Sequence, residues 1–151
     1  MNKLFIYYSN TGNGELVAKV LEAKGYEIRK VTPKKDLPKI MFFKILTGGF
    51  LAGLNKKMEL VNFNDDITDY DEIIIGSPIW NDRLSCPINT VLAKLNFENK
   101  KVKFILYAGG GKATKALTQI EEYVKDKEIV FLKEPKKYEE ELEKVNKIVG
   151  E

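Results

Sequence analysis

The sequence contains no histidine, one cysteine and one tryptophan, and these scarcities exclude several kinds of active site. Without histidine there can be no Ser-His-Asp triad, no Cys-His dyad and no HExxH zinc site. The single cysteine, Cys86, excludes an intrachain disulfide, a Cys-ligated zinc site and an iron–sulfur cluster held within the chain. No apolar run approaches the ~20 residues that cross a membrane, and the start does not resemble a signal peptide. We therefore expect a cytoplasmic protein without membrane insertion.

Neither sign of charge dominates the chain. Its 25 Lys and Arg residues against 22 Asp and Glu give a net charge of +3, which is too small to indicate nucleic-acid binding. The basic excess is local, because six lysines and only one acid lie within residues 34–57. A length of 151 residues, with 44% hydrophobic and 31% charged residues, predicts a single domain over residues 1–151.

Apolar runs and helical periodicity alternate along the sequence. Runs rich in β-branched and aromatic residues predict strands at residues 4–8, 26–31, 73–75, 102–107 and 129–132. Amphipathic stripes predict helices at residues 15–24, 88–95, 113–124 and 138–149. A further helix is expected from the irregular segment 36–60, although a membrane-surface helix is an alternative there. This pattern predicts an α/β fold, a three-layer doubly wound sandwich around a parallel sheet.

The character of each run predicts the order of the strands. Residues 26–29 alternate between apolar and polar side chains, as an edge strand can, whereas residues 4–8 and 104–107 are apolar throughout. This favours a five-stranded sheet of order 2-1-3-4-5. The alternative order 3-2-1-4-5-6 would need a sixth strand and a continuous second one.

Ligands of such a sheet bind beyond the carboxyl ends of the strands, where the strand order reverses. The first loop at this edge is Ser-Asn-Thr-Gly-Asn-Gly, residues 9–14, which leads into a helix. Hydroxyls, amides and glycines at a helix N-terminus suit an anionic phosphate, although the same residues also form ordinary turns and caps. Because the loop contains no Lys or Arg, we expect hydrogen bonds rather than an ion pair to hold a phosphate monoester.

Two further loops should lie at the same edge. Gly-Ser-Pro-Ile-Trp-Asn, residues 76–81, carries the only tryptophan, and we expect Trp80 to be exposed as a surface on which a planar heterocycle stacks. The alternative is a tryptophan folded back over the sheet edge. Ala-Gly-Gly-Gly-Lys, residues 108–112, lacks the first glycine of a Walker A motif, which excludes nucleoside triphosphate binding. Its glycines would instead let backbone amides approach a ring edge.

Together, these loops resemble those of the flavodoxin family. The resemblance rests on SNTGNG after the first strand, GSPIWN after the third, Pro87 before the next helix and YAGGG after the fourth strand. It spans nearly the whole chain, and residues 43–60 resemble a segment of short bacterial and archaeal flavodoxin-like proteins. The resemblance implies FMN as the cofactor. The binding residues that it implies are Ser9, Asn10, Thr11, Gly12, Asn13, Gly14, Ser77, Pro78, Ile79, Trp80, Asn81, Ala108, Gly109, Gly110 and Gly111.

Three features depart from the family pattern. Gly14 stands where the family usually has a threonine or a similar residue, which removes one phosphate hydroxyl. Asn81 and Asp82 replace the glycine-bearing turn that in many flavodoxins flips when the flavin takes up one electron. The isoelectric point of about 8.8 contrasts with the acidic character of typical flavodoxins. The last two departures predict that full reduction is easier and that the two one-electron steps lie closer together.

Two functions are compatible with this resemblance. The first is an electron carrier between protein partners, and the second is an FMN-dependent NAD(P)H oxidoreductase acting on a quinone or another small acceptor. We favour the carrier. Neither needs an acid–base side chain, so no catalytic residue is assigned, and a domain without flavin is disfavoured because all three loops carry suitable residues. Lys34, Lys35 and Lys39 should form a basic rim that attracts an acidic partner or a phosphorylated cofactor.

Two other groups of residues have simpler interpretations. An acidic run precedes the third strand, at the edge opposite the three loops, and we expect a solvated acidic loop rather than a metal site; it comprises Asp65, Asp66, Asp69, Asp71 and Glu72. Cys86 stands at a helix start, where a thiol pKa can be lowered, but an inert thiol is the favoured interpretation.

Overall fold

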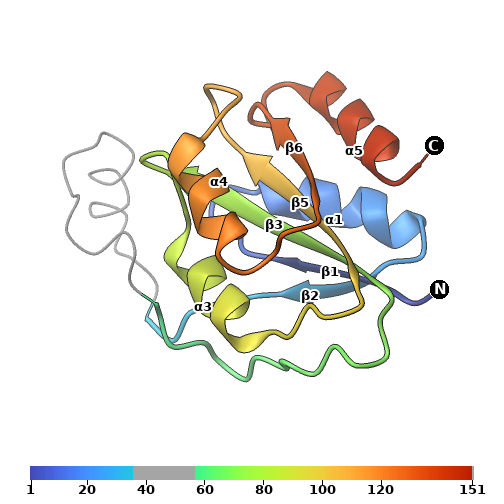
Figure 1. Ribbon diagram of the computed structural model, residues 1–151. Helices are drawn as coiled ribbons and strands as arrows, with labels where there is room; N and C mark the ends of the chain where they lie inside the picture. Colours follow the sequence, from blue (N-terminus) through green and yellow to red (C-terminus); the bar gives the residue numbers. More distant parts are fainter. Residues whose placement is uncertain (36–56, 151) are drawn as a thin grey trace.

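The computed structural model describes residues 1–35 and 57–150, which are built around a twisted sheet (Figure 1). Five parallel strands have the order β2-β1-β3-β5-β6, and a short strand, β4, pairs antiparallel with the end of β3. The predicted order 2-1-3-4-5 is therefore confirmed, with β5 and β6 as the fourth and fifth parallel strands. The strands are β1 (Lys3–Tyr7), β2 (Glu27–Lys30), β3 (Glu72–Trp80), β4 (Arg83–Leu84), β5 (Lys101–Tyr107) and β6 (Glu128–Leu132).

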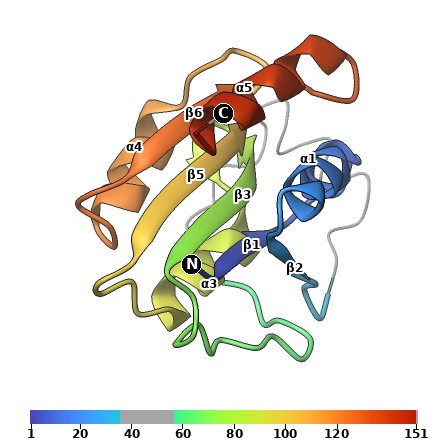
Figure 2. The same ribbon diagram turned by 90° about the vertical axis from the view of Figure 1, so that its right-hand side faces the viewer.

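Helices cover both faces of this sheet, as Figures 1 and 2 show. On one face lie α1 (Asn13–Ala23) and α5 (Glu143–Ile148), the latter preceded by the 3-10 turn η1 (Glu139–Leu142). On the other face lie α3 (Cys86–Lys94) and α4 (Thr114–Glu121). The fold is thus the predicted doubly wound sandwich. Most of the expected helix at 36–60 lies outside the described residues, and residues 57–60 are not helical.

The burial of each strand follows its place in the sheet. Leu4, Phe5 and Ile6 in β1 are fully buried, because helices cover both faces of this central strand. In β2, at the edge, the first and last residues are exposed and the middle two are half-buried. Burial of each large apolar side chain contributes about 1.5–3 kcal/mol, so the central strands hold most of the apolar stabilisation.

The described residues include no helix with the length and apolar character needed to cross a membrane.

The amino end of the sheet contains a buried charged network that corrects one prediction. Four acids of the run at residues 65–72 are exposed as expected, but Glu72 begins β3 and is 4% exposed. Its carboxylate accepts a hydrogen bond from the Tyr26 hydroxyl and lies 3.3 Å from Nζ of Lys103. Nζ of Lys103 also donates to the carbonyl of Ile148 at 2.5 Å, at the end of α5. The network therefore joins two strands and the last helix.

The environment of Glu72 favours its ionised form. Burial by itself would raise the pKa of the Glu72 carboxyl, but the hydrogen bond from Tyr26 and the charge of Lys103 lower that pKa overall. Conversely, burial and the neighbouring carboxylate raise the pKa of Tyr26, so the phenol stays protonated and continues to donate. No local sequence pattern indicates this pairing, because Lys103 lies inside an otherwise apolar strand.

Replacing Glu72 with glutamine tests this network. Glu72→Gln leaves the buried Lys103 without its counter-charge, so we expect the free energy of unfolding at pH 7 to fall by about 3–5 kcal/mol. The folded-state pKa of Glu72 is lowered. The stabilisation is therefore complete above the unfolded value of about 4.3 and is lost as the pH falls through the folded value. Urea unfolding at pH 7 and pH 3 should show a difference that shrinks at the lower pH.

Glu59→Gln is the matched control. The Glu59 side chain is 79% exposed and pairs with Lys34 at the surface, so its replacement should change the unfolding free energy by less than about 1 kcal/mol. Equal small losses in both variants, or a loss for Glu72→Gln that does not depend on pH, would contradict the role given to Glu72.

Candidate functional site

The loop between β1 and α1 is shaped by two glycines. Gly12 precedes the helix with φ of 95°, a left-handed conformation that strains residues with a side chain. Gly14 packs so closely on β1 that a Cβ there would lie 2.5 Å from the Tyr7 ring and 2.7 Å from the Cβ of Ser9. The glycine at position 14 therefore has a steric cause, since a threonine would not fit beside Tyr7.

The side chains of this loop are held by one another. The Ser9 hydroxyl accepts a hydrogen bond from the backbone N–H of Gly14 at 3.1 Å, and Ser9 is buried. The Asn13 amide donates to the Thr11 hydroxyl at 3.2 Å. Asn10 and Thr11 are exposed. The loop is thus a preformed turn at the start of a helix, the arrangement that suits an anion.

A lysine from the far end of the sequence covers this loop. The backbone N–H of Lys136 donates to Oδ1 of Asn13 at 2.9 Å, and its Nζ donates to the Thr11 carbonyl at 3.2 Å. A cavity of about 440 Å³ lies between the loop and the segment after β6, lined by Thr11, Asn13, Glu134, Lys136 and Lys137. The loop itself contains no Lys or Arg, and the structure brings a lysine beside it from another part of the chain.

The loop after β5 offers open space. Ala108 is buried and donates from its N–H to the Leu132 carbonyl at 2.9 Å, while Gly111 turns back with φ of 72°. Gly109 and Gly110 are exposed, and a Cβ on either would meet nothing within 4 Å. A flat group can therefore approach the backbone of these two glycines closely.

The segment 76–81 differs from the predicted loop. Strand β3 continues to Trp80, and Ile79 and Trp80 pair with β4 in a tight hairpin. Trp80 is 1% exposed and meets Tyr8 edge-to-face, with ring centroids 5.7 Å apart. The expectation of an exposed Trp80 in a loop was therefore wrong. Pairing with β4 and β5 extends the strand through residues that usually form turns.

The hairpin turn is fixed to α4. Asn81 and Asp82 have φ of 48° and 65°, the left-handed conformations of a two-residue type I′ turn. The carbonyl of Asp82 accepts from the N–H of Ala116 at 2.8 Å, and its carboxylate accepts from the N–H of Lys115 at 3.2 Å. Asp82 thus caps the start of α4 from another part of the chain.

The other β3 residues that were predicted to contact the flavin are buried or half-buried inside the protein. Ser77 is fully buried, and its hydroxyl lies 3.0 Å from that of Ser85. Pro78 and Ile79 are half-buried.

Cys86, at the start of α3, is buried, and burial raises the pKa of its thiol, in line with the expected inert thiol.

A layer of aromatic rings supports the site from beneath. Phe5 and Tyr7 stack with centroids 5.0 Å apart, and a Cβ on Gly76 would lie 2.6 Å from the hydroxyl of Tyr107. Burial raises the pKa of Tyr107 well above its usual value. Its hydroxyl has no hydrogen-bond partner within residues 1–35 and 57–150.

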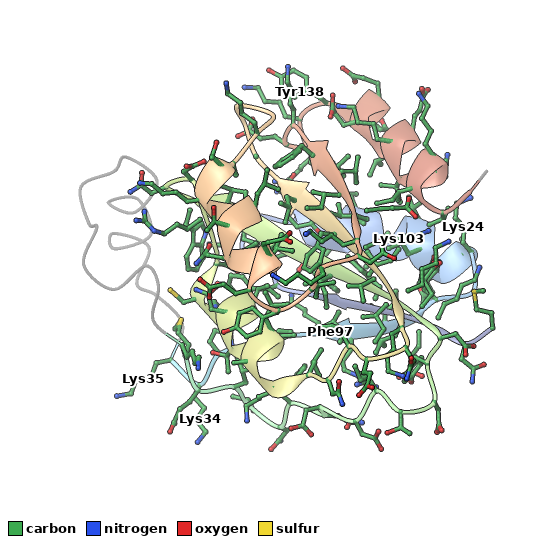
Figure 3. All side chains as sticks on the ribbon, viewed as in Figure 1. Lys24, Lys34, Lys35, Phe97, Lys103 and Tyr138 are labelled. Atoms are coloured by element: carbon green, nitrogen blue, oxygen red, sulfur yellow. The ribbon has the colours of Figure 1, made fainter. Side chains whose placement is uncertain are left out.

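The predicted basic rim is only partly present in the described residues. Lys34 pairs with Glu59 at 3.1 Å, and Lys35 is exposed; both lie beyond the carboxyl end of β2, far from Lys103 (Figure 3). Lys39 lies outside the described residues. The segment after β6 adds Lys133, whose Cε lies 3.4 Å from the place of a Cβ on Gly111. The sequence signal for this second basic group was a run of three lysines within residues 133–137, directly after the fifth parallel strand.

Comparisons with known proteins agree with the fold. No protein-family model and no curated protein matches the sequence. A crystal structure described as a "putative flavoprotein" from Bacteroides uniformis is similar with a TM-score of 0.74 and 21% identity, covering 99% of this chain and 98% of that one. A flavoprotein from Lactobacillus acidophilus in complex with FMN has a TM-score of 0.61 and 18% identity, covering 92% and 97%. A flavodoxin from the domain Archaea has a TM-score of 0.53 and 12% identity, covering 97% and 92%. The fold is therefore flavodoxin-like.

Fluorescence of the single tryptophan tests whether the side chain of Trp80 is buried. We expect a blue-shifted emission that acrylamide quenches poorly, because Trp80 is buried. Trp80→Ala should lower the free energy of unfolding by about 3–5 kcal/mol. Tyr123→Ala, at a ring that is 41% exposed, should cost far less. Emission like that of free tryptophan, with equal losses in both variants, would instead support an exposed indole.

Proposed function

We propose that the protein binds FMN at the carboxyl edge of its sheet and uses it to carry electrons between redox partners. One observation carries this proposal: a preformed helix start and an open glycine loop lie at the same edge of the sheet. Gly12 turns the backbone into α1 beside the Lys136 side chain, and Gly109 and Gly110 leave open space after β5. A ligand that fits both places has an anionic end and a flat end, which is the shape of a flavin mononucleotide.

The residues present fit the phosphate end of FMN. The turn at residues 9–12 is preformed, and the first N–H groups of a helix lack partners within it, so those of α1 apart from Gly14, which donates to Ser9, would donate to a phosphate. The exposed Thr11 hydroxyl lies beside the cavity and could add a hydrogen bond. Position 14 contributes no hydroxyl to a phosphate, because the close contact with Tyr7 requires a glycine there.

The ring end of FMN would lie over Gly109 and Gly110. Backbone groups of these exposed glycines can approach a ring edge, since no side chain intervenes. Stacking on Trp80 would require the flavin to reach a face of an indole that is 1% exposed. We therefore assign the ring contacts first to the glycine loop and keep the Trp80 stack as a separate, testable contact.

Bound FMN would supply the electron transfer or hydride transfer, and the chain would bind, orient and shield it. None of the residues at this edge needs to act as an acid or a base, which agrees with the absence of histidine. An acidic protein partner would suit the exposed Lys35 and the lysines after β6, because complementary charges speed association.

Flavin titration tests this proposal. We expect one FMN to bind per chain. Binding is measured by the quenching of flavin fluorescence and of Trp80 emission. Riboflavin should bind at least tenfold more weakly, because it lacks the phosphate, and hydrogen bonds to a charged group contribute about 1.5–3 kcal/mol. Gly110→Val should weaken both flavins alike, since it fills open space without disturbing the fold.

Lys125→Val is the control for this variant, because its side chain is 80% exposed and belongs to no predicted contact with the ligand. It should leave both affinities unchanged. Absence of binding for FMN and riboflavin would reject the proposal. Equal affinities for the two would remove the phosphate role from residues 9–14.

A second candidate function is an FMN-dependent NAD(P)H oxidoreductase acting on a quinone or another small acceptor. The specific observation in its favour is the hairpin turn fixed to α4. Rotation of the peptide that carries the Asp82 carbonyl would break the hydrogen bond from Ala116, which contributes about 0.5–1.5 kcal/mol. The Asp82 carboxylate adds a second link to α4, through Lys115. A turn that resists this rotation would favour transfer of two electrons at once by a bound flavin.

A spectroelectrochemical titration of the FMN-loaded protein distinguishes these functions. If the protein is an oxidoreductase, the wild type should take up both electrons over one narrow range of potential. Asp82→Gly removes the hydrogen bond from Lys115 and gives the turn a glycine that rotates more freely, so it should separate the two steps. Asp82→Asn keeps an oxygen that can accept from Lys115 and should behave like the wild type. Two widely separated steps in the wild-type protein would favour the electron carrier instead.

A further inference from the structure

We propose that Lys136 is the counter-charge of the cofactor phosphate, which makes this site select flavins that carry a phosphate. The inference rests on the proposed function and adds a residue that none of the three loops contains. It assigns the phosphate site to two parts of the chain, the turn at residues 9–12 and the segment that follows β6.

The position of Lys136 supports this role. Its Nζ lies 3.6 Å from the place of a Cβ on Gly12, directly over the start of α1. The backbone of Lys136 is fixed independently of its side chain, through the 2.9 Å hydrogen bond from its N–H to Asn13. The side chain can therefore exchange the Thr11 carbonyl for a phosphate oxygen while the backbone remains in place.

The carboxylates around the cavity pair with other lysines, so the Lys136 ammonium can bind a phosphate. Lys137 pairs with Glu134 at 3.9 Å, and Glu15, in the first turn of α1, pairs with Lys30 at 2.6 Å. Within the described part of the chain, no carboxylate lies within 4.0 Å of Nζ of Lys136. Its ammonium is held only by a neutral carbonyl, which a phosphate dianion would outcompete.

The side chains of the loop are largely engaged with one another. The Ser9 hydroxyl is buried and accepts from the N–H of Gly14. The Asn13 amide is engaged with Thr11 and with Lys136. Gly14 has no side chain to donate. The exposed Thr11 hydroxyl and the Lys136 ammonium, which both line the cavity, are therefore well placed to donate to a phosphate beside the backbone N–H groups.

Matched lysine variants test the inference in the full-length protein. Binding of FMN and of riboflavin is measured by fluorescence titration at low and high salt for the wild type, Lys136→Met, Lys136→Arg and Lys125→Met. We expect Lys136→Met to weaken FMN by about tenfold or more, to leave riboflavin within twofold, and to reduce the salt dependence of FMN binding. Lys136→Arg should retain FMN binding, and Lys125→Met, at a lysine that is 80% exposed and away from the cavity, should bind both flavins like the wild type.

The outcomes separate this inference from the proposed function. A wild-type protein that binds neither flavin would reject the function and the inference together. FMN binding that Lys136→Met leaves unchanged would reject only the inference. An equal loss of FMN and riboflavin would also reject it, because the lysine would then act on the structure of the loop. An equal loss of FMN binding in Lys125→Met would also reject the inference, because the effect would then come from general surface charge.

Discussion

The site depends on one steric constraint: aromatic rings at the ends of β1 and β5 occupy the space beside two glycines. Tyr7 fills the place of a Cβ on Gly14, and Phe5 and Tyr107 fill the place of a Cβ on Gly76. Because glycine stands at position 14, α1 can begin close against Tyr7 of β1. The N-terminus of α1 is then at the same edge of the sheet as the open glycines after β5, and the pairing of β1, β3 and β5 fixes the two relative to each other.

The two edges of the sheet divide stability and binding between them. The amino edge contains the buried charges of Glu72 and Lys103, which join β3, β5 and α5 and leave little freedom for substitution. The carboxyl edge holds its polar groups in short turns at the surface. The two edges are nevertheless connected, since the segment with Lys136 runs from β6 into η1 and α5, and Lys103 fixes the end of α5. The anchor at one edge thereby helps to hold the lysine at the other.

Local sequence patterns predicted the parts of the fold that depend on residues close together in the sequence. The alternation at residues 26–29 identified an edge strand, and the glycines at 109–111 indicated an open loop. Three other features depend on contacts between distant residues and could not be predicted this way. β3 continues through Gly-Ser-Pro because β4 and β5 pair with it, which buries Trp80. Glu72 is buried because Lys103 and Tyr26 meet it from other strands. Lys136 reaches the first loop although 123 residues separate it from Asn13.

That last contact also sets an order of assembly during synthesis. The ribosome produces the turn at residues 9–12 first, whereas Lys136 follows only after β6, the last strand of the sheet. Until then, the nascent chain carries the turn without the segment that covers it. A phosphate ligand held by both parts, as we propose, would be bound in full only after the ribosome has made the segment that follows β6. Cofactor loading would in this way wait for the synthesis of all five parallel strands.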